Sequence, residues 1–530
     1  MTLFLQFRLW LRRAPRSERA LAAAATALVL SLAGWLLVPP SSNNADANAA
    51  LGTQPGQPLS ATPGATAPAS PGASLPPGAT SAPGPGSQTV TSSGNSGAGG
   101  VPAPGASAGG GTQSGTDGSG GCTSPPGSDQ GVSDTQIKVA VILINLVGQA
   151  GNSAFGLPPP DTQRKWFQDV IDATNASGGV ACRKIAPLFY QGNPADASNL
   201  QQLCLQITQA KPFMVIDLGA YTVNPDIATC YPKAGLPFRT TTPLPASQVE
   251  QYYPYMFSTT IAEMRYRNAV FGLKQRGFFS KGFKKLGVVY RDCVQQIPDQ
   301  FFSWLKQAGV PSSAVVSYNF GCPSSGFASP SDIQAAILKF KQAGVTHMTE
   351  FEDTGDFPNF TNIAQQQGFT PKWGIPDDGV VATSYGSQHP NYQNIANAIA
   401  ITDSRYGEEK TPGYVPSAGS KACNDIFKPA GDGTVHSQSA GLGGLMCNDI
   451  WLFKAAVEHA RAMSRTELAG GLQAARSVEF SYPDGPNTFE PNQFTGSKVT
   501  YGDQFWRVDQ FLPSCNCWHV VDSTFHGSFS

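Results

Sequence analysis

Positive charge is missing from a long stretch near the start of the chain, since no Lys or Arg lies between Arg19 and Lys138. Cysteine is absent from residues 1–121, because the first of the ten cysteines is Cys122. This absence excludes a lipid-modified cysteine at the end of the apolar run that spans residues 20–38. Large apolar side chains are nearly absent from residues 39–132, which are rich in Pro, Gly, Ser, Thr and Ala. Such a segment cannot bury a core, so we expect it to be a disordered linker.

Motifs for common catalytic chemistry are missing as well. The chain has no G-x-x-x-x-G-K-[ST] phosphate loop and no H-E-x-x-H zinc helix, and no G-x-S-x-G elbow joins a predicted strand to a helix. The six histidines show no metal-ligand spacing. The balance of 35 basic to 36 acidic residues gives no electrostatic case for nucleic acid. We therefore expect a protein that is not an enzyme and that has no metal, cofactor or nucleic-acid partner.

The N-terminal residues predict insertion into a membrane. Residues 1–19 carry five arginines, and the 19-residue run at 20–38, apolar apart from Thr26 and Ser31, reaches about 28 Å as a helix, close to the ~30 Å hydrocarbon core of a bilayer. The positive-inside rule places residues 1–19 in the cytoplasm and the rest of the chain outside it. This interpretation predicts a single-pass protein of the cell membrane. A cleaved signal peptide, giving a secreted protein, is the alternative, because residues 45–49 contain two A-x-A-like sites.

From about residue 133 onward, short apolar runs alternate with amphipathic stretches. We predict strands at 137–146, 184–190, 213–218 and 237–240, with helices at 162–176, 195–210 and 225–234. The pattern then restarts with helices at 263–276, 298–308, 331–343 and 357–367 and strands at 285–290, 314–318, 347–351 and 372–375. Alternation of this kind is typical of parallel sheets with helices on both faces. Two successive sets predict an α/β protein of two doubly wound lobes, with one large sheet as the alternative.

The ten cysteines are an even number in an exported segment, which indicates disulfides. Spacing relative to the predicted helices, strands and loops favours three pairs: Cys204 with Cys230, Cys293 with Cys322, and Cys423 with Cys447. Four cysteines remain without a predicted partner: Cys122, Cys182, Cys515 and Cys517. A zinc site at Cys515-x-Cys517 is the alternative for the last two.

Several segments, in their order along the chain, resemble one protein family. They are VSDT at 132–135, NASGG at 175–179, KKLGVVY at 284–290, QGFTPK at 367–372 and CND at 447–449. Over roughly residues 133–512 the chain resembles the type I periplasmic binding proteins, in particular the class that binds leucine, isoleucine, valine and related amides. The resemblance implies two lobes joined by three hinge crossovers, near residues 258–260, 402–404 and 484–494. Lobe 1 would then comprise 133–258 plus 403–485, and lobe 2 would comprise 259–402 plus 486–530.

The same resemblance implies a set of ligand-binding residues where the predicted strands end. In lobe 1 they follow two strands: Ala220, Tyr221, Thr222, Thr240, Thr241 and Thr242. These match positions where the family presents small hydroxyl residues to a ligand carboxylate, although Thr241 and Thr242 could instead cap a turn before a proline. In lobe 2 the candidates are acidic: Asp292, Glu352 and Asp377. Asp377 matches the family's ligand for an ammonium group, and a solvated loop position is the alternative for Glu352.

Two departures from the family pattern bear on specificity. Residues 293–296 stand where the family commonly has a Tyr-Gly pair, and the loop at 148–160 carries Phe155 and three prolines in place of a Ser-Gly turn. The pocket could therefore suit another amide, a peptide fragment or an aromatic ligand. The resemblance predicts an extracytoplasmic solute-binding protein for an ABC importer whose permease and ATPase subunits are separate chains. The alternative is a ligand-sensing or cell-envelope interaction module with the same fold and no transport role.

Overall fold

The computed structural model of the chain describes residues 124–529, apart from gaps at 147, 155, 222–224, 294–295, 323–326, 351–355, 377–380, 382–388, 411–412 and 432–440. The predicted basic segment, membrane segment and most of the linker lie outside the described residues. Within the described part, no helix has both the length and the apolar character needed to cross a bilayer. Residues 112–530 form one compact unit, and every hydrophobic cluster described below lies within it. This unit therefore contains the cores that it needs to fold on its own.

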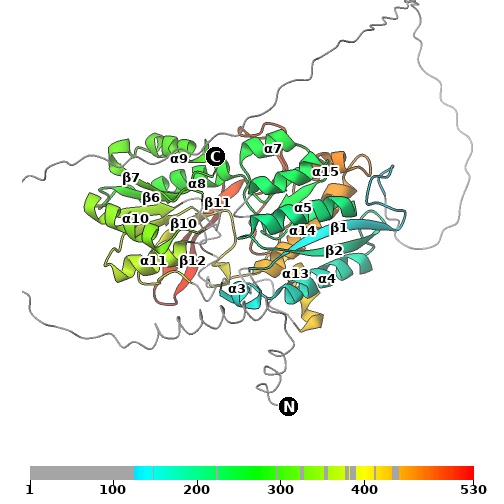
Figure 1. Cartoon of the computed structure of the whole chain (residues 1–530), viewed down its shortest axis with the longest axis horizontal. Helices are drawn as coiled ribbons and strands as arrows, with labels where there is room; N and C mark the ends of the chain where they lie inside the picture. Colours follow the sequence, from blue (N-terminus) through cyan, green and yellow to red (C-terminus); the bar gives the residue numbers. More distant parts are fainter. Residues whose placement is uncertain are drawn as a thin grey trace, which may run out of the picture. The chain divides into compact units, whose positions relative to one another are not determined.

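Five parallel strands form the first sheet, in the order β2-β1-β3-β4-β5. The first two of these, β2 and β1, lie side by side in Figure 1. The strands are β1 (Gln136–Ile144), β2 (Lys184–Gly192), β3 (Met214–Asp217), β4 (Phe238–Thr240) and β5 (Met256–Ser258). From residue 139 onward every side chain of β1 is buried. A strand that is apolar on both faces suits a central place in a parallel sheet covered by helices, and β1 lies between β2 and β3.

Helices of the first lobe come from two separate parts of the chain. They are α3 (Gln149–Ala154), α4 (Pro160–Ala176), α5 (Ala197–Ala210), α6 (Cys230–Lys233), α7 (Ala246–Tyr252), α13 (Ala418–Phe427), α14 (Leu442–Glu458) and α15 (Leu468–Ala475). Helix α4 begins with a proline at its first position, where no N–H is needed, and buries Trp166, Phe167, Val170 and Ile171 on one face. It packs against α13 and α14, so the late helices return to the first lobe.

The second sheet is mixed. Its order is β12-β11-β10-β9-β8-β6-β7, where β6 (Leu286–Tyr290), β7 (Val315–Asn319), β8 (His347–Glu350), β9 (Lys372–Ile375) and β10 (Ile399–Thr402) are parallel. Strands β11 (Phe505–Leu512) and β12 (Cys517–Gly527) extend it with antiparallel pairs. The sequence predicts a parallel sheet for the second lobe. The antiparallel strands β11 and β12 correct this prediction. The four-residue loop between β11 and β12 is too short for a parallel crossover and allows only antiparallel pairing.

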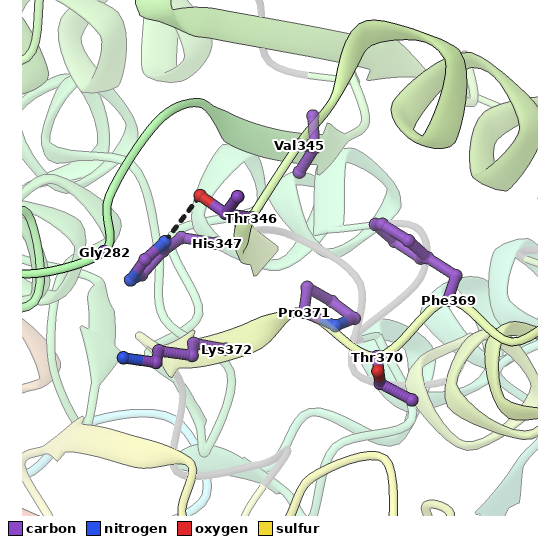
Figure 2. Close-up of a pocket in the computed structure, with 8 residues that line it drawn as sticks. All are labelled: Gly282, Val345, Thr346, His347, Phe369, Thr370, Pro371 and Lys372. Atoms are coloured by element: carbon purple, nitrogen blue, oxygen red, sulfur yellow. Dashed lines mark hydrogen bonds between the residues drawn. The ribbon is translucent and has the colours of Figure 1, made fainter.

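Among the described residues, the helices that pack around the second sheet are α8 (Ala262–Gln275), α9 (Gln296–Gln307), α10 (Pro330–Ala343) and α11 (Phe357–Gln366). Two hydrophobic clusters fill the spaces between these helices and the strands. At the amino ends of β8 and β9 the surface has a hollow of about 360 Å³ (Figure 2). Because it lies at the first residues of the strands, this hollow is at the opposite end of the sheet from the strands' carboxyl ends.

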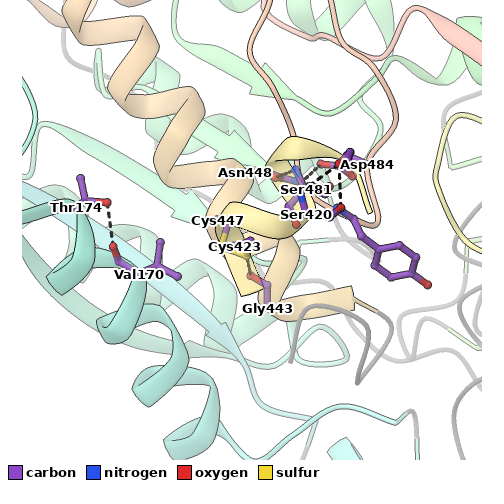
Figure 3. Close-up of a disulfide and its surroundings, with 11 residues drawn as sticks. Val170, Thr174, Ser420, Cys423, Gly443, Cys447, Asn448, Ser481 and Asp484 are labelled. Carbon is purple, nitrogen blue, oxygen red and sulfur yellow. Dashed lines mark hydrogen bonds between the residues drawn. A yellow bond between two sulfur atoms is a disulfide. The ribbon is translucent and has the colours of Figure 1, made fainter. Parts of the chain in front are cut away.

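Disulfides join four pairs of the described cysteines. Three are the pairs that the spacing favours: Cys204–Cys230, Cys293–Cys322 and Cys423–Cys447. The last of these is drawn in Figure 3. The fourth joins Cys515 to Cys517, so these two sulfurs do not form the zinc site considered as an alternative. Cys182 is also disulfide-bonded, and its partner lies outside the described residues.

The folded body begins earlier than predicted, because residues 124–132 pack on it instead of belonging to the linker. Asp129 accepts the backbone N–H of Arg465 (2.8 Å) and pairs with its guanidinium (3.2 Å). These contacts lower the pKa of Asp129 against the opposing effect of its partial burial. The Pro126 carbonyl accepts the N–H of Met463 at 2.8 Å. The composition of residues 124–132 does not distinguish them from the linker. The residues that they contact lie more than 300 residues away in the chain.

Three chain segments pass between the two sheets, and hydrogen bonds hold them side by side. The first follows β5, where the Thr259 carbonyl accepts the N–H groups of Gly502 (3.2 Å) and Asp503 (3.1 Å) of the third segment. The second follows β10, where Ser404 forms an antiparallel bridge with Asp484, also of the third segment. The third segment therefore contacts both of the others.

The third segment crosses later than predicted. Phe489, Val499 and Tyr501 belong to the hydrophobic cluster of the first lobe, so this lobe continues to about residue 501 instead of ending at 485. Residues 485–501 contain no helix or named strand. This segment has no periodic apolar pattern. Tertiary packing alone therefore decides to which lobe its apolar side chains belong.

Buried charged and polar side chains of the first lobe hold the crossing segments in place. The guanidinium of Arg239 on β4 pairs with Asp449 on α14 at 3.0 Å, and both side chains are fully buried. Arg239 also donates to the Thr259 hydroxyl of the first crossing segment (3.0 Å). Next to Asp449, the amide of Asn448 donates to Asp484 of the third segment at 3.0 Å (Figure 3). The Asn-Asp pair that carried part of the family resemblance therefore ties α14 to the crossing segments.

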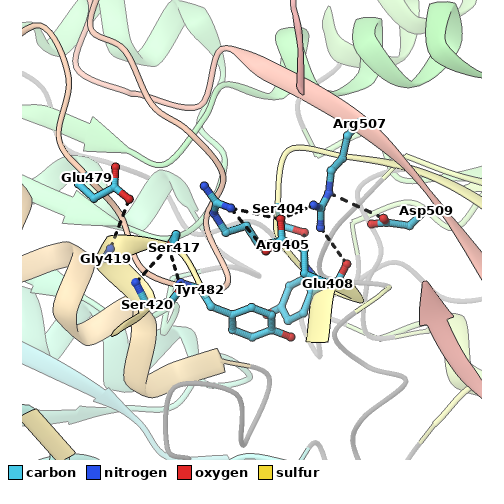
Figure 4. A network of polar contacts seen from close by, with 11 residues as sticks. Ser404, Arg405, Glu408, Ser417, Gly419, Ser420, Glu479, Tyr482, Arg507 and Asp509 are labelled. Carbon is cyan, nitrogen blue, oxygen red and sulfur yellow. Dashed lines mark hydrogen bonds and ion pairs between the residues drawn. The ribbon is translucent and has the colours of Figure 1, made fainter. Parts of the chain in front are cut away.

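A second buried network fixes β11 in the other sheet (Figure 4). Arg507 pairs with Glu408 at 2.5 Å, donates to the Tyr406 carbonyl at 3.1 Å, and lies 3.8 Å from Asp509. The Thr402 hydroxyl donates to Asp509 at 3.1 Å. Burial raises the pKa of Asp509 to about 7 against the opposing charge of Arg507. These contacts hold β11 on β10 directly after the third crossing.

Candidate ligand-binding site

The carboxyl ends of β3 and β4 are joined by one buried carboxylate, Asp217, the last residue of β3. It accepts the backbone N–H of Ala220 at 2.8 Å and the Thr240 hydroxyl at 2.9 Å. Burial raises its pKa to about 6, although these hydrogen bonds act in the opposite direction. In open parallel sheets this edge is where ligands bind. Asp217 therefore fixes the two loops that carry the predicted first-lobe ligand residues.

Most of the described first-lobe candidates point inward. The Tyr221 ring packs edge-on against Tyr231 and Phe238, and its hydroxyl lies 2.8 Å from that of Tyr231. The Thr240 hydroxyl donates to Asp217 and accepts the Thr242 N–H at 3.1 Å. These contacts give the side chains of Tyr221 and Thr240 a structural role.

Thr241 differs from its neighbours, because its side chain is half-exposed at the end of β4. The side chain of Thr242 is buried. Thr222 lies outside the described residues. Among the described hydroxyl candidates of the first lobe, Thr241 is thus the one best placed to meet a ligand.

Two buried amides, which the sequence analysis did not single out, fix the loop after β1. Gln163 on α4 accepts the N–H of Ile144 (2.9 Å) and donates to the carbonyls of Ile144 (2.8 Å) and Pro158 (2.9 Å). Asn152 on α3 donates to the same two carbonyls and accepts the N–H of Leu146 at 2.7 Å. This loop, which departs from the family pattern in sequence, therefore has a defined conformation that these two side chains hold in place. A polar residue within the apolar face of a predicted helix was the available signal for Gln163.

In the second lobe the residue after β6, Arg291, is buried and pairs with Asp356 at 2.6 Å. Asp356 also accepts the N–H of Ala328, at 2.7 Å, so this pair joins the end of β6 to the starts of two helices. The neighbouring Asp292 is half-exposed and accepts the amide of Asn319 at 2.8 Å. The remaining second-lobe candidates, Glu352 and Asp377, lie outside the described residues.

Comparison with known families decides what this two-sheet architecture is. A family described as periplasmic binding protein matches residues 159–501, more than half of the chain. The chain belongs to the periplasmic binding protein family. This match, with the fold, confirms the resemblance to type I periplasmic binding proteins. No curated protein matches the chain.

Solved structures agree with this periplasmic binding protein fold. The branched-chain amino acid transporter substrate-binding protein of Streptococcus pneumoniae, in complex with isoleucine, is 16% identical, with a TM-score of 0.50 over 73% of this chain and 99% of that one. A solute-binding protein of an ABC transporter from Rhodopseudomonas palustris, with 3,4-dihydroxybenzoic acid, is 14% identical, with a TM-score of 0.53 over 74% and 98%. A fatty acid ABC transporter substrate-binding protein from Thermomonospora curvata is 13% identical, with a TM-score of 0.53 over 77% and 95%. At these identities the likeness concerns the fold.

We expect Asp217 to make the stability of this periplasmic binding protein depend on pH. Its pKa in the folded protein, about 6, exceeds the usual 3.8, so the folded state holds the proton more tightly than the unfolded state. Stability from this group is then greatest below about pH 4, falls as pH rises to about 6, and changes no further above that. We expect Asp217→Asn to remove roughly 2–3 kcal/mol of the loss in unfolding free energy between pH 4 and pH 7. Urea unfolding at several pH values measures this.

The matched control is Asp134→Asn, at an exposed aspartate. It should leave the pH dependence as in the wild type. An unchanged pH profile for Asp217→Asn would contradict the assignment of that slope to Asp217.

Proposed function

We propose that the protein is an extracytoplasmic solute-binding protein that captures a small carboxylate between its two lobes and delivers it to an ABC importer. Family membership supports a binding role of this kind. The observation that carries the proposal is the arrangement at the first-lobe edge, where Asp217 fixes two loops and Thr241 is left half-exposed. Threonine hydroxyls and backbone N–H groups at such an edge are suited to bind a carboxylate.

The ligands named for similar structures suggest which chemical class of ligand this protein binds. Isoleucine, 3,4-dihydroxybenzoic acid and a fatty acid are named for the three proteins described above. The rest of each molecule differs, but all three compounds carry a carboxyl group. A carboxylate site in the first lobe, with a variable second lobe, is consistent with all three. For an amino-acid ligand, Asp377 remains our candidate for the ammonium group, with Thr222, Asp292 and Glu352 as further contacts.

Binding should close the lobes only through contacts that a ligand makes with both of them. The permease and ATPase subunits would be separate chains in the membrane. A location outside the cytoplasm follows from the family's role. The membrane segment at 20–38 remains a prediction from the sequence.

The proposal predicts that acids, and not their amides, raise the melting temperature of the protein. A thermal-shift screen would compare leucine with leucinamide and 3,4-dihydroxybenzoate with its amide, and would include a fatty acid. The shift should follow RT ln(1 + [L]/Kd). For an acid that binds, Thr241→Val should weaken affinity by about tenfold to 100-fold, because it removes a hydrogen bond to a charged group.

Thr524→Val is the control, because Thr524 is exposed on β12 in the other sheet. It should bind the acid as the wild type does. Equal shifts from an acid and its amide would exclude a carboxylate site. Affinity unchanged by Thr241→Val would remove Thr241 from the site without excluding binding.

A further inference from the structure

Basic residues gather in one part of the second lobe where acidic residues are missing. Between Glu263 and Asp292 the chain has eight Lys or Arg residues and no Asp or Glu, although the whole chain has 35 basic and 36 acidic residues. Several of these basic side chains are exposed in the turn after α8 and before β6. Four of the eight lie within this turn, residues 276–285: Arg276, Lys281, Lys284 and Lys285.

The fold adds a further lysine to this turn. The N–H of Lys284 donates to the Thr346 hydroxyl at 3.0 Å, which places the turn against the amino end of β8. A Cβ atom at Gly282 would lie 3.9 Å from Nζ of Lys372, the first residue of β9. Gly282, Thr346 and Lys372 all line the hollow at this end of the sheet (Figure 2). We call five residues of this region the basic surface: Arg276, Lys281, Lys284, Lys285 and Lys372.

The charge of the basic surface is not balanced within the described part of the chain. None of the ion pairs there includes any of its five residues. His347, which also lines the hollow, adds no charge at neutral pH, because burial and the nearby Lys372 lower its pKa to about 4. The positive charges of the basic surface therefore belong to the four lysines and Arg276.

Aromatic rings are interleaved with these lysines. Phe279 and Phe283 are half-exposed, and their ring centroids lie 5.7 Å apart. Phe278 is buried, and together with Phe283 it packs edge-on against the His347 ring, which holds the turn in place. Partly exposed rings beside lysines are typical of surfaces that bind the headgroup region of anionic bilayers, where ammonium groups meet phosphates and rings lie at the interface.

We propose that the basic surface binds the anionic headgroups of a phospholipid membrane, with Phe279 and Phe283 at the headgroup level. A membrane is favoured over a small soluble anion because the lysines are spread over the outside of a turn, whereas the hollow itself is lined by Lys372 together with mainly apolar or uncharged residues. The site is separate from the proposed ligand site, because it lies at the amino ends of β8 and β9 and not at strand carboxyl ends.

Vesicle sedimentation of the compact unit 112–530 tests the proposal without interference from the apolar N-terminal run. The protein should bind vesicles with about 30% phosphatidylglycerol, but not phosphatidylcholine vesicles, at about 50 mM salt, and should dissociate at about 300 mM salt. Lys281→Glu combined with Lys284→Glu should weaken vesicle binding roughly tenfold or more, with an unchanged melting temperature.

The matched control is Lys421→Glu with Lys428→Glu, which makes the same change in net charge at two exposed lysines of the first lobe. It should bind vesicles as the wild type does. Equal weakening by both pairs would show a net-charge effect and overturn the assignment to this surface. Absence of vesicle binding by the wild type would overturn the proposal. Binding to a soluble anionic polymer, such as polyphosphate, without binding to vesicles would also overturn the proposal.

Discussion

Replacing Arg239 by methionine is expected to lower the free energy of unfolding by about 3–5 kcal/mol. The change leaves Asp449 fully buried without its guanidinium partner. It also removes the hydrogen bond from Arg239 to the Thr259 hydroxyl in the first crossing segment. A buried ion pair contributes little net stability compared with apolar residues, but removal of one partner leaves the other charge uncompensated. Urea unfolding at pH 8 measures the loss.

The loss should be smaller at pH 5 than at pH 8. Burial already raises the pKa of Asp449 to about 7, although Arg239 acts to lower it. Without Arg239 the pKa rises further, so at pH 5 the carboxyl is neutral and its burial costs less. The sign follows from linkage: a group whose pKa is raised in the folded state contributes stability that declines as pH rises toward that value.

A double variant and a surface control test this explanation for Arg239. Arg239→Met combined with Asp449→Ala removes both charges, so it should be more stable than the sum of the two single changes predicts. Arg461→Met, in an ion pair where the arginine is 87% exposed, should leave the stability nearly unchanged, because solvent screens such a pair. Strict additivity of the two single changes would contradict an uncompensated charge as the cause.

The regular part of the fold could be predicted from the sequence because its signals are local. The strand predicted at 372–375 has the bounds of β9, and the helix predicted at 331–343 differs from α10 by one residue at its start. Each has an apolar pattern of its own. Strands β10, β11 and β12 were missed, since they lie next to crossing segments and their direction depends on pairing with distant strands.

The candidate site was less predictable, for a related reason. An aspartate at the end of an apolar strand is usually solvent-exposed, and nothing local indicates that Asp217 is buried. Its burial depends on Thr240, which is contributed by the neighbouring strand β4. The inward orientation of Tyr221 similarly depends on Tyr231 and Phe238. The sequence thus placed these residues near the ends of β3 and β4, whereas their side-chain direction required tertiary contacts.

Removal of the Cys423–Cys447 disulfide by alanine at both positions is expected to cost about 3 kcal/mol of unfolding free energy. The two cysteines are fully buried and are separated by 24 residues, and the bond joins α13 to α14. The loop that it closes restricts the unfolded chain, and a longer closed loop gives a larger entropic effect. A melting-temperature decrease of roughly 3–4 °C should accompany the change in a folded body of about 400 residues.

The Cys515–Cys517 disulfide provides the control, because it closes a separation of only two residues. Serine at both positions should cost about 1–2 kcal/mol, roughly half of the effect at the longer loop. The Cys423–Cys447 bond has a further consequence, since α14 also carries Asn448 and Asp449, which contact Asp484 and Arg239. Loss of this disulfide should therefore loosen the crossing region, and hydrogen exchange at residues 481–484 should become faster. Unchanged exchange there, with the expected loss of stability, would show that the bond acts on the unfolded chain alone.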